Sequence, residues 1–147
     1  MTRSKRLAPL IKLAREGEIR AARAMAEARR QLEDQQRRLS DLKAYHRDYQ
    51  KRIGTAGRNG INAGDLNRYK TFLTRLDGVI ALQAQQVERM AAHYAAMRTL
   101  WTEARARYRS LETAAERYRR EELRADDRRE QQQSDDHTPS RPTAAHD

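Results

Sequence analysis

Apolar residues recur along two segments of the chain with alternating steps of four and three positions. The first stripe runs from Leu7 to Ile53 and the second runs from Leu66 to Tyr118. The polar exceptions within the two stripes are Glu18, Gln35, His46 and Gln83. A spacing of 3.5 residues sustained over many heptads is typical of coiled-coil helices. The pattern therefore predicts two helices, at about residues 7–53 and about 65–125.

A glycine-rich segment separates the two stripes. Four of the six glycines lie within residues 54–64, and Asn59-Gly60 stands at the centre of that segment. This composition predicts a turn. Asn62 or Asp65 is placed to cap the helix that follows by accepting a backbone N–H. Two helices joined by a short loop fold back on each other, so the predicted fold is all-α, a long two-helix antiparallel coiled-coil hairpin.

The sizes of the seam residues predict how the two helices pair. A bulky ring fits the narrow seam of a two-stranded coiled coil where the facing residue is small. Three alanines of the first helix match three aromatic residues of the second in antiparallel order: Ala14 with Tyr108, Ala21 with Trp101, and Ala28 with Tyr94. This register centres the hairpin on residue 61, which lies inside the predicted turn.

The composition agrees with a coiled coil rather than a compact globular core. The chain has 147 residues, of which 37% are hydrophobic and 35% are charged. That is a charged, helix-rich profile, and the length allows one domain at most. The apolar stripe is lost in the last residues, which are rich in Gln, Asp and Pro. We therefore predict one coiled-coil domain over residues 1–130 and a disordered tail over 131–147.

The net charge of +10 points to an acidic partner. Residues 121–147 hold more acidic than basic side chains, so residues 1–120 carry more than the whole net positive charge. A basic body suits nucleic acid, anionic lipid or an acidic protein surface, and the charge alone does not choose among them.

The residues that usually form catalytic, metal or cofactor sites are absent or badly spaced. There is no cysteine, and the four histidines have no HxxxH spacing or carboxylate cluster around them. The glycine segment lacks the GK[ST] of a phosphate-binding loop and follows a helix rather than a strand. The serines lie in polar contexts, and the sequence gives no support for a nucleophilic triad. We therefore expect no enzyme activity, no metal and no cofactor. With no signal peptide or membrane span in the sequence, we expect a soluble cytoplasmic protein.

The segment NRYKTFLTRLDGVI, residues 67–80, holds more large apolar side chains than one seam uses. With the seam positions labelled a and d, Tyr45, Phe72 and Val79 all occupy position g. In an antiparallel pair the g positions of both helices share one flank of the hairpin. The other flank at this level is polar. Its residues are Lys43, Gln50, Lys70 and Asp77.

These g residues join nearby seam residues in one surface near the loop, which we call the apolar strip. It consists of Leu42, Tyr45, Tyr49, Phe72, Leu76 and Val79, with Arg38 and Gln83 at its borders. Two interpretations remain open for it. The strip is either a local thickening of the seam or a docking surface for a partner protein. A two-helix hairpin has no further layer of its own to cover an apolar strip, which favours docking.

Several motifs resemble the flagellar FliJ family of bacterial export proteins. They are RLAPLIKLA near the N-terminus, YHRDY before the loop, and LNRYKTFLTRLDGVI after it, followed by LQAQQV and a single tryptophan, Trp101. The resemblance covers about residues 5–130. It implies an antiparallel coiled coil similar to part of the γ subunit of rotary ATP synthases. The spacing of the tyrosines, Phe72 and Leu76 around the loop is its most specific part.

The resemblance also implies partners. Such proteins act as the central stalk of the hexameric flagellar export ATPase, link it to the export gate protein of the inner membrane, and escort export chaperones. They work in the cytoplasm, peripherally at the cytoplasmic face of that membrane. In the family the gate's cytoplasmic domain binds a patch near the loop. Matched by position, that patch is Arg38, Leu42, Tyr45, Tyr49, Phe72, Leu76, Val79 and Gln83.

The end of the coiled coil that carries the termini would then face the ATPase. On the general basicity of that end, the candidate contacts with the ATPase are Arg15, Arg20, Arg23, Arg117 and Arg119.

Two alternative functions stay open. The same stretch resembles, more faintly, the stalk proteins of virulence-type injectisomes, which differ in system rather than in chemistry. A basic helical hairpin could also bind nucleic acid. Against that alternative, the arginines are spread along the whole hairpin and the aromatic residues lie mostly in the seam rather than on a basic face.

Overall fold

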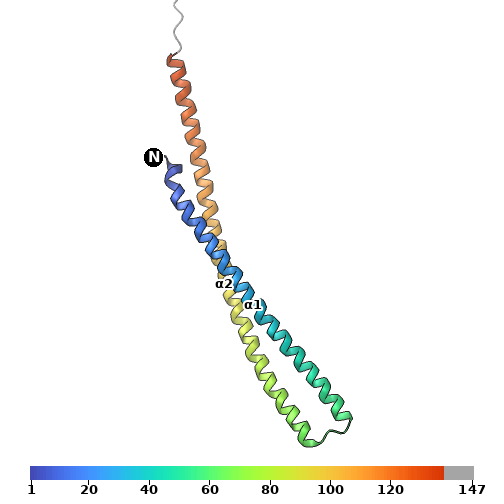
Figure 1. The fold of residues 1–147 in the computed structure, drawn as a ribbon. Coiled ribbons are helices and arrows are strands. Elements are labelled where there is room, and N and C mark those ends of the chain that lie inside the picture. Colours follow the sequence, from blue (N-terminus) through green and yellow to red (C-terminus); the bar gives the residue numbers. More distant parts are fainter. Residues whose placement is uncertain (138–147) are drawn as a thin grey trace, which may run out of the picture. The chain divides into compact units, whose positions relative to one another are not determined.

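The computed structural model describes residues 1–137 and contains two helices in that range (Figure 1). Helix α1 spans Arg3–Arg58 and helix α2 spans Ala63–His137. The described residues contain no strand. The predicted all-α class, with two long antiparallel helices joined near residue 61, is confirmed.

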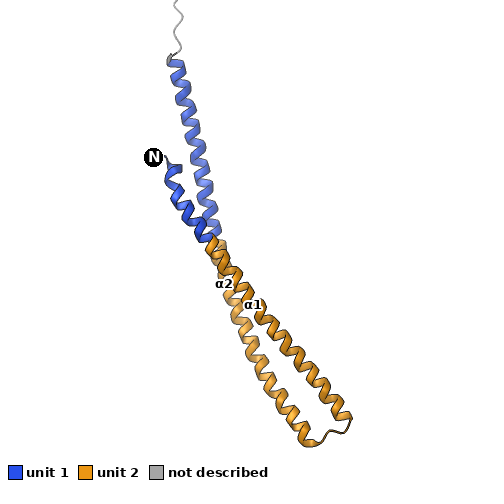
Figure 2. Cartoon of the chain, viewed as in Figure 1, with its two compact units in different colours: residues 1–18, 104–147 blue, residues 19–103 orange. Residues whose placement is uncertain are grey.

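The described chain forms two compact units, and each helix contributes to both (Figure 2). Unit 1 contains the start of α1, residues 1–18, and the part of α2 that begins at residue 104. Unit 2 is the hairpin of residues 19–103. The sequence predicted a single coiled-coil domain over 1–130. In a two-helix pair, each residue contacts only residues at the same height along the two helices. The contacts of the described residues therefore divide into two groups, which are the two units.

Burial follows the predicted seam in both units. Each residue of the two apolar stripes, including their four polar exceptions, is at least partly buried. Ala28 in unit 2 and Ala115 in unit 1 are each 1% exposed. The contacts across the seam follow the predicted antiparallel register within a few residues, as with Tyr49 and Phe72, whose ring centroids are 4.5 Å apart. A 3.5-residue period thus located the core, because it keeps one face of each helix toward the other.

The turn is shorter than the predicted loop of residues 54–64. Helix α1 continues to Arg58 and ends in a Schellman motif, in which the N–H of Ile61 donates to the carbonyl of Ala56 at 3.2 Å and the N–H of Gly60 donates to that of Gly57 at 3.4 Å. Gly60 has φ +86°, which a residue with a side chain rarely adopts. Of the clustered glycines, Gly60 is the one that ends the helix.

Local caps explain where the helices begin. The backbone N–H of Asp65 donates to Oδ1 of Asn62 at 2.8 Å, so Asn62 rather than Asp65 caps α2. At the start of α1, the N–H of Lys5 donates to Oγ1 of Thr2 at 3.4 Å. The N–H of Arg6 donates to the backbone carbonyl of Thr2 at 3.1 Å. Thr2 therefore starts α1 at Arg3, four residues before the first apolar residue of the stripe.

Helix α2 also extends beyond its predicted end. It continues past residue 125 to His137, so residues 131–137 of the predicted disordered tail are helical. Arg, Glu and Gln side chains are good helix formers, and i,i+3 and i,i+4 contacts support the helix. Arg129 lies 3.8 Å from Asp126, and Arg128 donates to the carbonyl of Arg124 at 3.3 Å. The rest of the predicted tail, residues 138–147, lies outside the described residues.

In unit 1, Ser4 near the start of α1 forms hydrogen bonds with Glu122 of α2. Both the backbone N–H and the hydroxyl of Ser4 donate to the Glu122 carboxylate, at 3.2 and 2.7 Å. These two bonds favour the charged carboxylate, and the hydroxyl bond is the main reason that the pKa of Glu122 lies below its ordinary value of 4.5. Nearby, the Arg3 guanidinium lies 5.6 Å from the ring centroid of Tyr118.

Replacing Ser4 by Ala is expected to raise the pKa of Glu122 toward 4.5, because the charged carboxylate loses its hydroxyl donor. The pKa of Glu122 is lower in the folded state than in the unfolded state. The contact therefore stabilises the fold at pH values above the ordinary pKa, and this stabilisation is lost as the pH falls through the pKa of the folded state. An NMR titration of the Glu122 carboxyl carbon in both proteins measures the change. An unchanged pKa in the Ser4→Ala protein would contradict the assignment.

Candidate docking surface

Four aromatic rings pack together beside the turn in unit 2. Tyr49 lies at the centre, with ring centroids 4.5 Å from Phe72, 5.5 Å from Tyr69 and 6.1 Å from Tyr45. Tyr45 and Phe72 meet edge to face at 6.2 Å. Tilted and edge-to-face pairs at these separations are favourable. The rings of the two helices therefore stabilise one another's positions.

The apolar strip divides into a buried base and an exposed edge. Leu76 is 7% exposed and belongs to the core of the hairpin, while Leu42, Tyr49 and Phe72 are partly buried. Tyr45 is 50% exposed and Val79 is 48% exposed. Ring contacts join Tyr45, Tyr49 and Phe72 across the hairpin. Two of the six residues present large exposed apolar area.

Leu82 extends this exposed edge, and the sequence analysis missed it. It is 66% exposed and lies three residues after Val79, so the two side chains are neighbours on the surface of α2. Its heptad position is c, beside g on the side away from the seam. An apolar residue at c next to an apolar g was the signal that could have found it. We call Tyr45, Phe72, Val79 and Leu82 together the docking edge.

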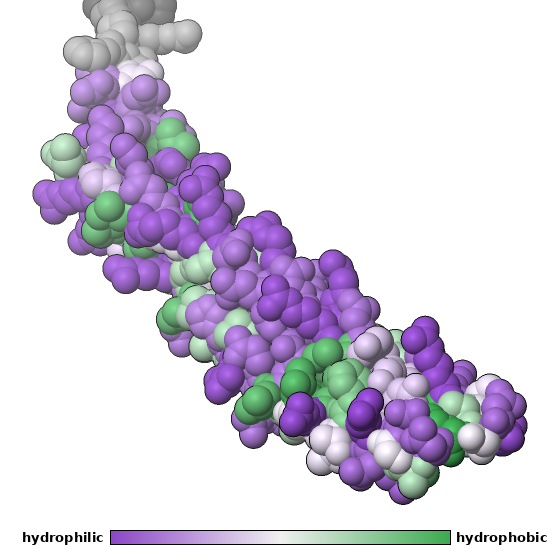
Figure 3. Space-filling model, turned by 60° about the horizontal axis from the view of Figure 1, so that its bottom comes forward, coloured by the Kyte–Doolittle hydropathy of each residue, from purple (hydrophilic) through white to green (hydrophobic). Residues whose placement is uncertain are grey.

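A space-filling view agrees with a local apolar surface. On the face seen in Figure 3, apolar side chains gather over the loop half of unit 2 and hydrophilic ones border them. The opposite flank at this level is polar: Lys43, Gln50, Lys70 and Asp77 are all exposed. Asp77 accepts from Nε2 of His46 at 2.7 Å. Only one flank therefore offers an apolar contact surface.

The two polar border residues differ in their environment. Arg38 is exposed and makes no ion pair within residues 1–137. Gln83 is partly buried, and its amide nitrogen donates to the side-chain and backbone oxygens of Gln35, at 2.8 and 3.0 Å. Two of the polar exceptions in the apolar stripes thus satisfy each other across the seam. Gln83 uses its donors inside the hairpin, which leaves Arg38 as the border residue with free donors.

The five arginines proposed from basicity are divided between the two units. All are exposed, but Arg15, Arg117 and Arg119 belong to unit 1, whereas Arg20 and Arg23 belong to unit 2. The hydrogen bond to Glu112 raises the pKa of Tyr108. The charge of Arg15 lies close enough to the tyrosine to oppose this rise. The five are therefore separate surface cations within two units.

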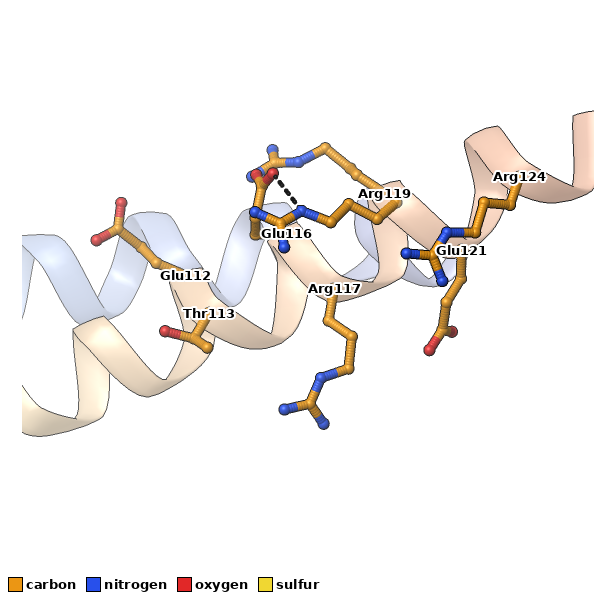
Figure 4. Close-up of a pocket in the computed structure, with 8 residues that line it drawn as sticks. Glu112, Thr113, Glu116, Arg117, Arg119, Glu121 and Arg124 are labelled. Carbon is orange, nitrogen blue, oxygen red and sulfur yellow. Dashed lines mark hydrogen bonds and ion pairs between the residues drawn. The ribbon is translucent and has the colours of Figure 1, made fainter. Parts of the chain in front are cut away.

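Acidic neighbours neutralise part of the arginine-rich stretch of α2. Glu116 pairs with Arg119 at 3.2 Å and with Arg120 at 3.4 Å. Figure 4 shows Glu116 and Arg119 close together, while Arg117 points away from Glu116. The hollow of about 570 Å³ along this stretch is lined by residues of α2 alone. It is an open surface of one helix rather than an enclosed site, and Arg117 and Arg124, which line it, make no ion pair within residues 1–137.

The described residues offer no metal site and no membrane helix. No group of three or more His, Asp or Glu side chains within residues 1–137 is placed to hold a metal ion. Neither α1 nor α2 is long and apolar enough to cross a membrane.

The described residues form an antiparallel helical pair with an aromatic cluster beside its turn. Comparison with protein families gives the particular family: the model of the flagellar FliJ protein family matches residues 3–143. The chain belongs to the FliJ family, and it is therefore a component of flagellar type III protein export. No curated protein and no solved structure matches it.

Proposed function

We propose that the docking edge binds the cytoplasmic domain of the export gate protein. The observation that supports this most is the exposure of Tyr45 and Val79 beside a rigid aromatic cluster, on one flank of unit 2. Exposed aromatic and aliphatic side chains already held in place lose little entropy on binding, which is typical of residues that dominate protein interfaces. Arg38 at the border adds a free cation.

In this proposal the chain is a non-enzymatic link between the export ATPase and the export gate protein. In this proposal the end of the coiled coil that carries the termini serves as the central stalk of the hexameric export ATPase. Arg15, Arg20, Arg23, Arg117 and Arg119 are the candidate contacts. Arg119 is paired with Glu116, whereas the other four are exposed and make no ion pair within residues 1–137. An escort role for export chaperones completes the proposal. The protein would act in the cytoplasm, peripherally at the inner membrane.

Deletion of the gene tests this function, with motility in soft agar and filament protein in the medium as the readouts. We expect both to be lost, and to be restored by the wild-type chain. A chain with Tyr45→Ala and Phe72→Ala is expected not to restore them, although its circular dichroism stays helical. A chain with Lys43→Ala and Lys70→Ala on the polar flank is the matched control and should restore both. Full motility of the deletion strain would refute an export role.

The ATPase contact has its own test. Charge reversal Arg117→Glu is expected to weaken co-purification with the export ATPase and to leave gate binding unchanged, because Arg117 lies in unit 1 and the docking edge lies in unit 2. Arg119→Glu is a useful comparison, since Arg119 is already paired with Glu116. Normal ATPase binding by both proteins would remove these arginines from the interface.

A further inference from the structure

Acidic residues border the docking edge on the α1 side. Tyr45 has Asp41 four residues before it and Asp48 three residues after it, so both carboxylates neighbour the tyrosine on the helix surface. Both occupy heptad position c, which lies beside g on the side away from the seam. They are exposed, and neither makes an ion pair within residues 1–137. The outer border of the docking edge on α1 thus carries two unpaired negative charges.

Basic residues border the docking edge on the α2 side. Phe72 has Arg68 four residues before it and Arg75 three residues after it, and Val79 follows Arg75 by four residues. Both arginines are also at position c and are exposed. Arg75 makes no ion pair within residues 1–137, and Arg68 only approaches Asp65 at 3.8 Å with its side chain 86% exposed. This outer border therefore carries two cations that are free to meet a partner.

The apolar edge is thus flanked by charge rows of opposite sign. We call Asp41 and Asp48 the acidic row and Arg68 and Arg75 the basic row. Arg38 and Arg52 stand at the two ends of the edge on α1, each seven residues from Tyr45, and they add positive charge beyond the acidic row. Between these ends, the side of α1 next to Tyr45 is negative and the side of α2 next to Phe72 is positive.

The shape of the surface favours a helical occupant. The backbone N–H and carbonyl groups of α1 and α2 pair within their own helices at this level, so no strand can add to an open edge here. Two adjacent helices with an apolar flank form the groove that a third amphipathic helix fills. From Phe72 to Leu82 the edge extends for about 15 Å along α2, which is close to three turns of such a helix.

We propose that the docking edge takes an amphipathic helix with one basic and one acidic border, and that the two charge rows fix the direction in which this helix lies. A helix of that kind fits the apolar groove in two directions. Only one of them places its basic border on Asp41 and Asp48 and its acidic border on Arg68 and Arg75; the other places like charges together. The inference rests on the docking surface of the proposed function and adds the chemistry and polarity of its partner.

A designed peptide tests the direction of docking. The probe is an 18-residue helix with a leucine stripe, lysines along one border and glutamates along the other, with a dye at its N-terminus. The chain has no cysteine, so Thr71→Cys on exposed surface near the turn carries the second dye alone. Energy transfer between the dyes reports which end of the bound peptide lies near the turn.

We expect the wild-type rows to hold the peptide in one direction with a preference of about three- to tenfold, since exposed ion pairs contribute modestly. The chain with both rows reversed, Asp41→Lys, Asp48→Lys, Arg68→Glu and Arg75→Glu, should bind it with similar affinity in the opposite direction. All four positions are exposed, and circular dichroism checks that the helices persist. The same direction in both chains, no preferred direction, or no binding would overturn the inference.

A second probe separates this inference from charge attraction to a basic chain. A peptide with glutamates on both borders should bind the wild-type chain more weakly than the mixed peptide does, despite the net charge of +10. Tighter binding of the all-acidic peptide would overturn the role of the acidic row.

The gate protein, in lipid nanodiscs, is tested in parallel. If it binds while the peptide shows no direction, the inference fails alone. If the peptide is oriented while the gate does not bind, the gate assignment fails alone.

Discussion

A chain carrying Tyr45→Ala and Val79→Ser is expected to bind the gate protein at least about 30-fold more weakly than the wild-type chain. One apolar hot spot at the centre of an interface contributes about 2 kcal/mol or more, which is about 30-fold in affinity, and the losses of two neighbouring hot spots need not add. Both side chains are about half exposed, at 50% and 48%, so their loss removes contact surface without opening the seam. Titration of the gate protein in lipid nanodiscs measures the affinity.

The matched control for this variant carries Lys43→Ala and Lys70→Ala. These residues lie at the same level on the polar flank and are exposed. We expect gate binding within twofold of wild type for the control, and helical circular dichroism at the assay temperature for all three chains. Equal binding by the control and by the Tyr45→Ala, Val79→Ser chain would mean that the docking edge does not carry the interface.

The largest expected effect on stability comes from Leu76→Ala. Leu76 is 7% exposed at the base of the apolar strip, and truncating a buried leucine removes about 2–5 kcal/mol from the free energy of unfolding. Leu82→Ala, six residues away on the same helix, is the comparison because Leu82 is 66% exposed. It is expected to change the free energy by less than about 0.5 kcal/mol. Urea unfolding followed by circular dichroism measures both, and equal losses would contradict the division into base and edge.

The seam could be predicted from the sequence because a single physical rule controls it. A heptad spacing keeps the same face of each helix toward its partner, so periodicity alone identified residues such as Ala28 and Ala115 as core. The pairing of small with bulky residues added the register. Neither step needed knowledge of individual contacts, which explains why both succeeded at the level of whole helices.

The ends of the elements depended on single hydrogen bonds that the spacing does not report. Four glycines suggested a loop from residue 54, yet the helix ends where Gly60 adopts a positive φ. Similarly, the apolar stripe ends near residue 125, while α2 runs on to His137 through contacts between charged neighbours such as Asp126 and Arg129. Periodicity measures burial, and these segments are helical without being buried.

The candidate docking surface was predictable in position but not in detail. Heptad labels predicted Tyr45, Phe72 and Val79 on one flank; in the structure the rings of Tyr45 and Phe72 meet at 6.2 Å, and Tyr45 and Val79 are about half exposed. The labels did not show that Gln83 would bond to Gln35. That outcome depends on how the two side chains lie across the seam. The arginines were harder still, because basicity alone does not reveal which of them pair with Glu116.

The central claim is that the docking edge touches the export gate in the working apparatus. Its most direct test is a photo-crosslinking amino acid placed at Val79 in cells, compared with the same residue placed at Lys70 on the polar flank. Both positions are exposed and lie on the same helix. The account predicts a crosslinked product with the gate protein from position 79 and none from position 70. Absence of the gate product at position 79, or equal products at both positions, would contradict it.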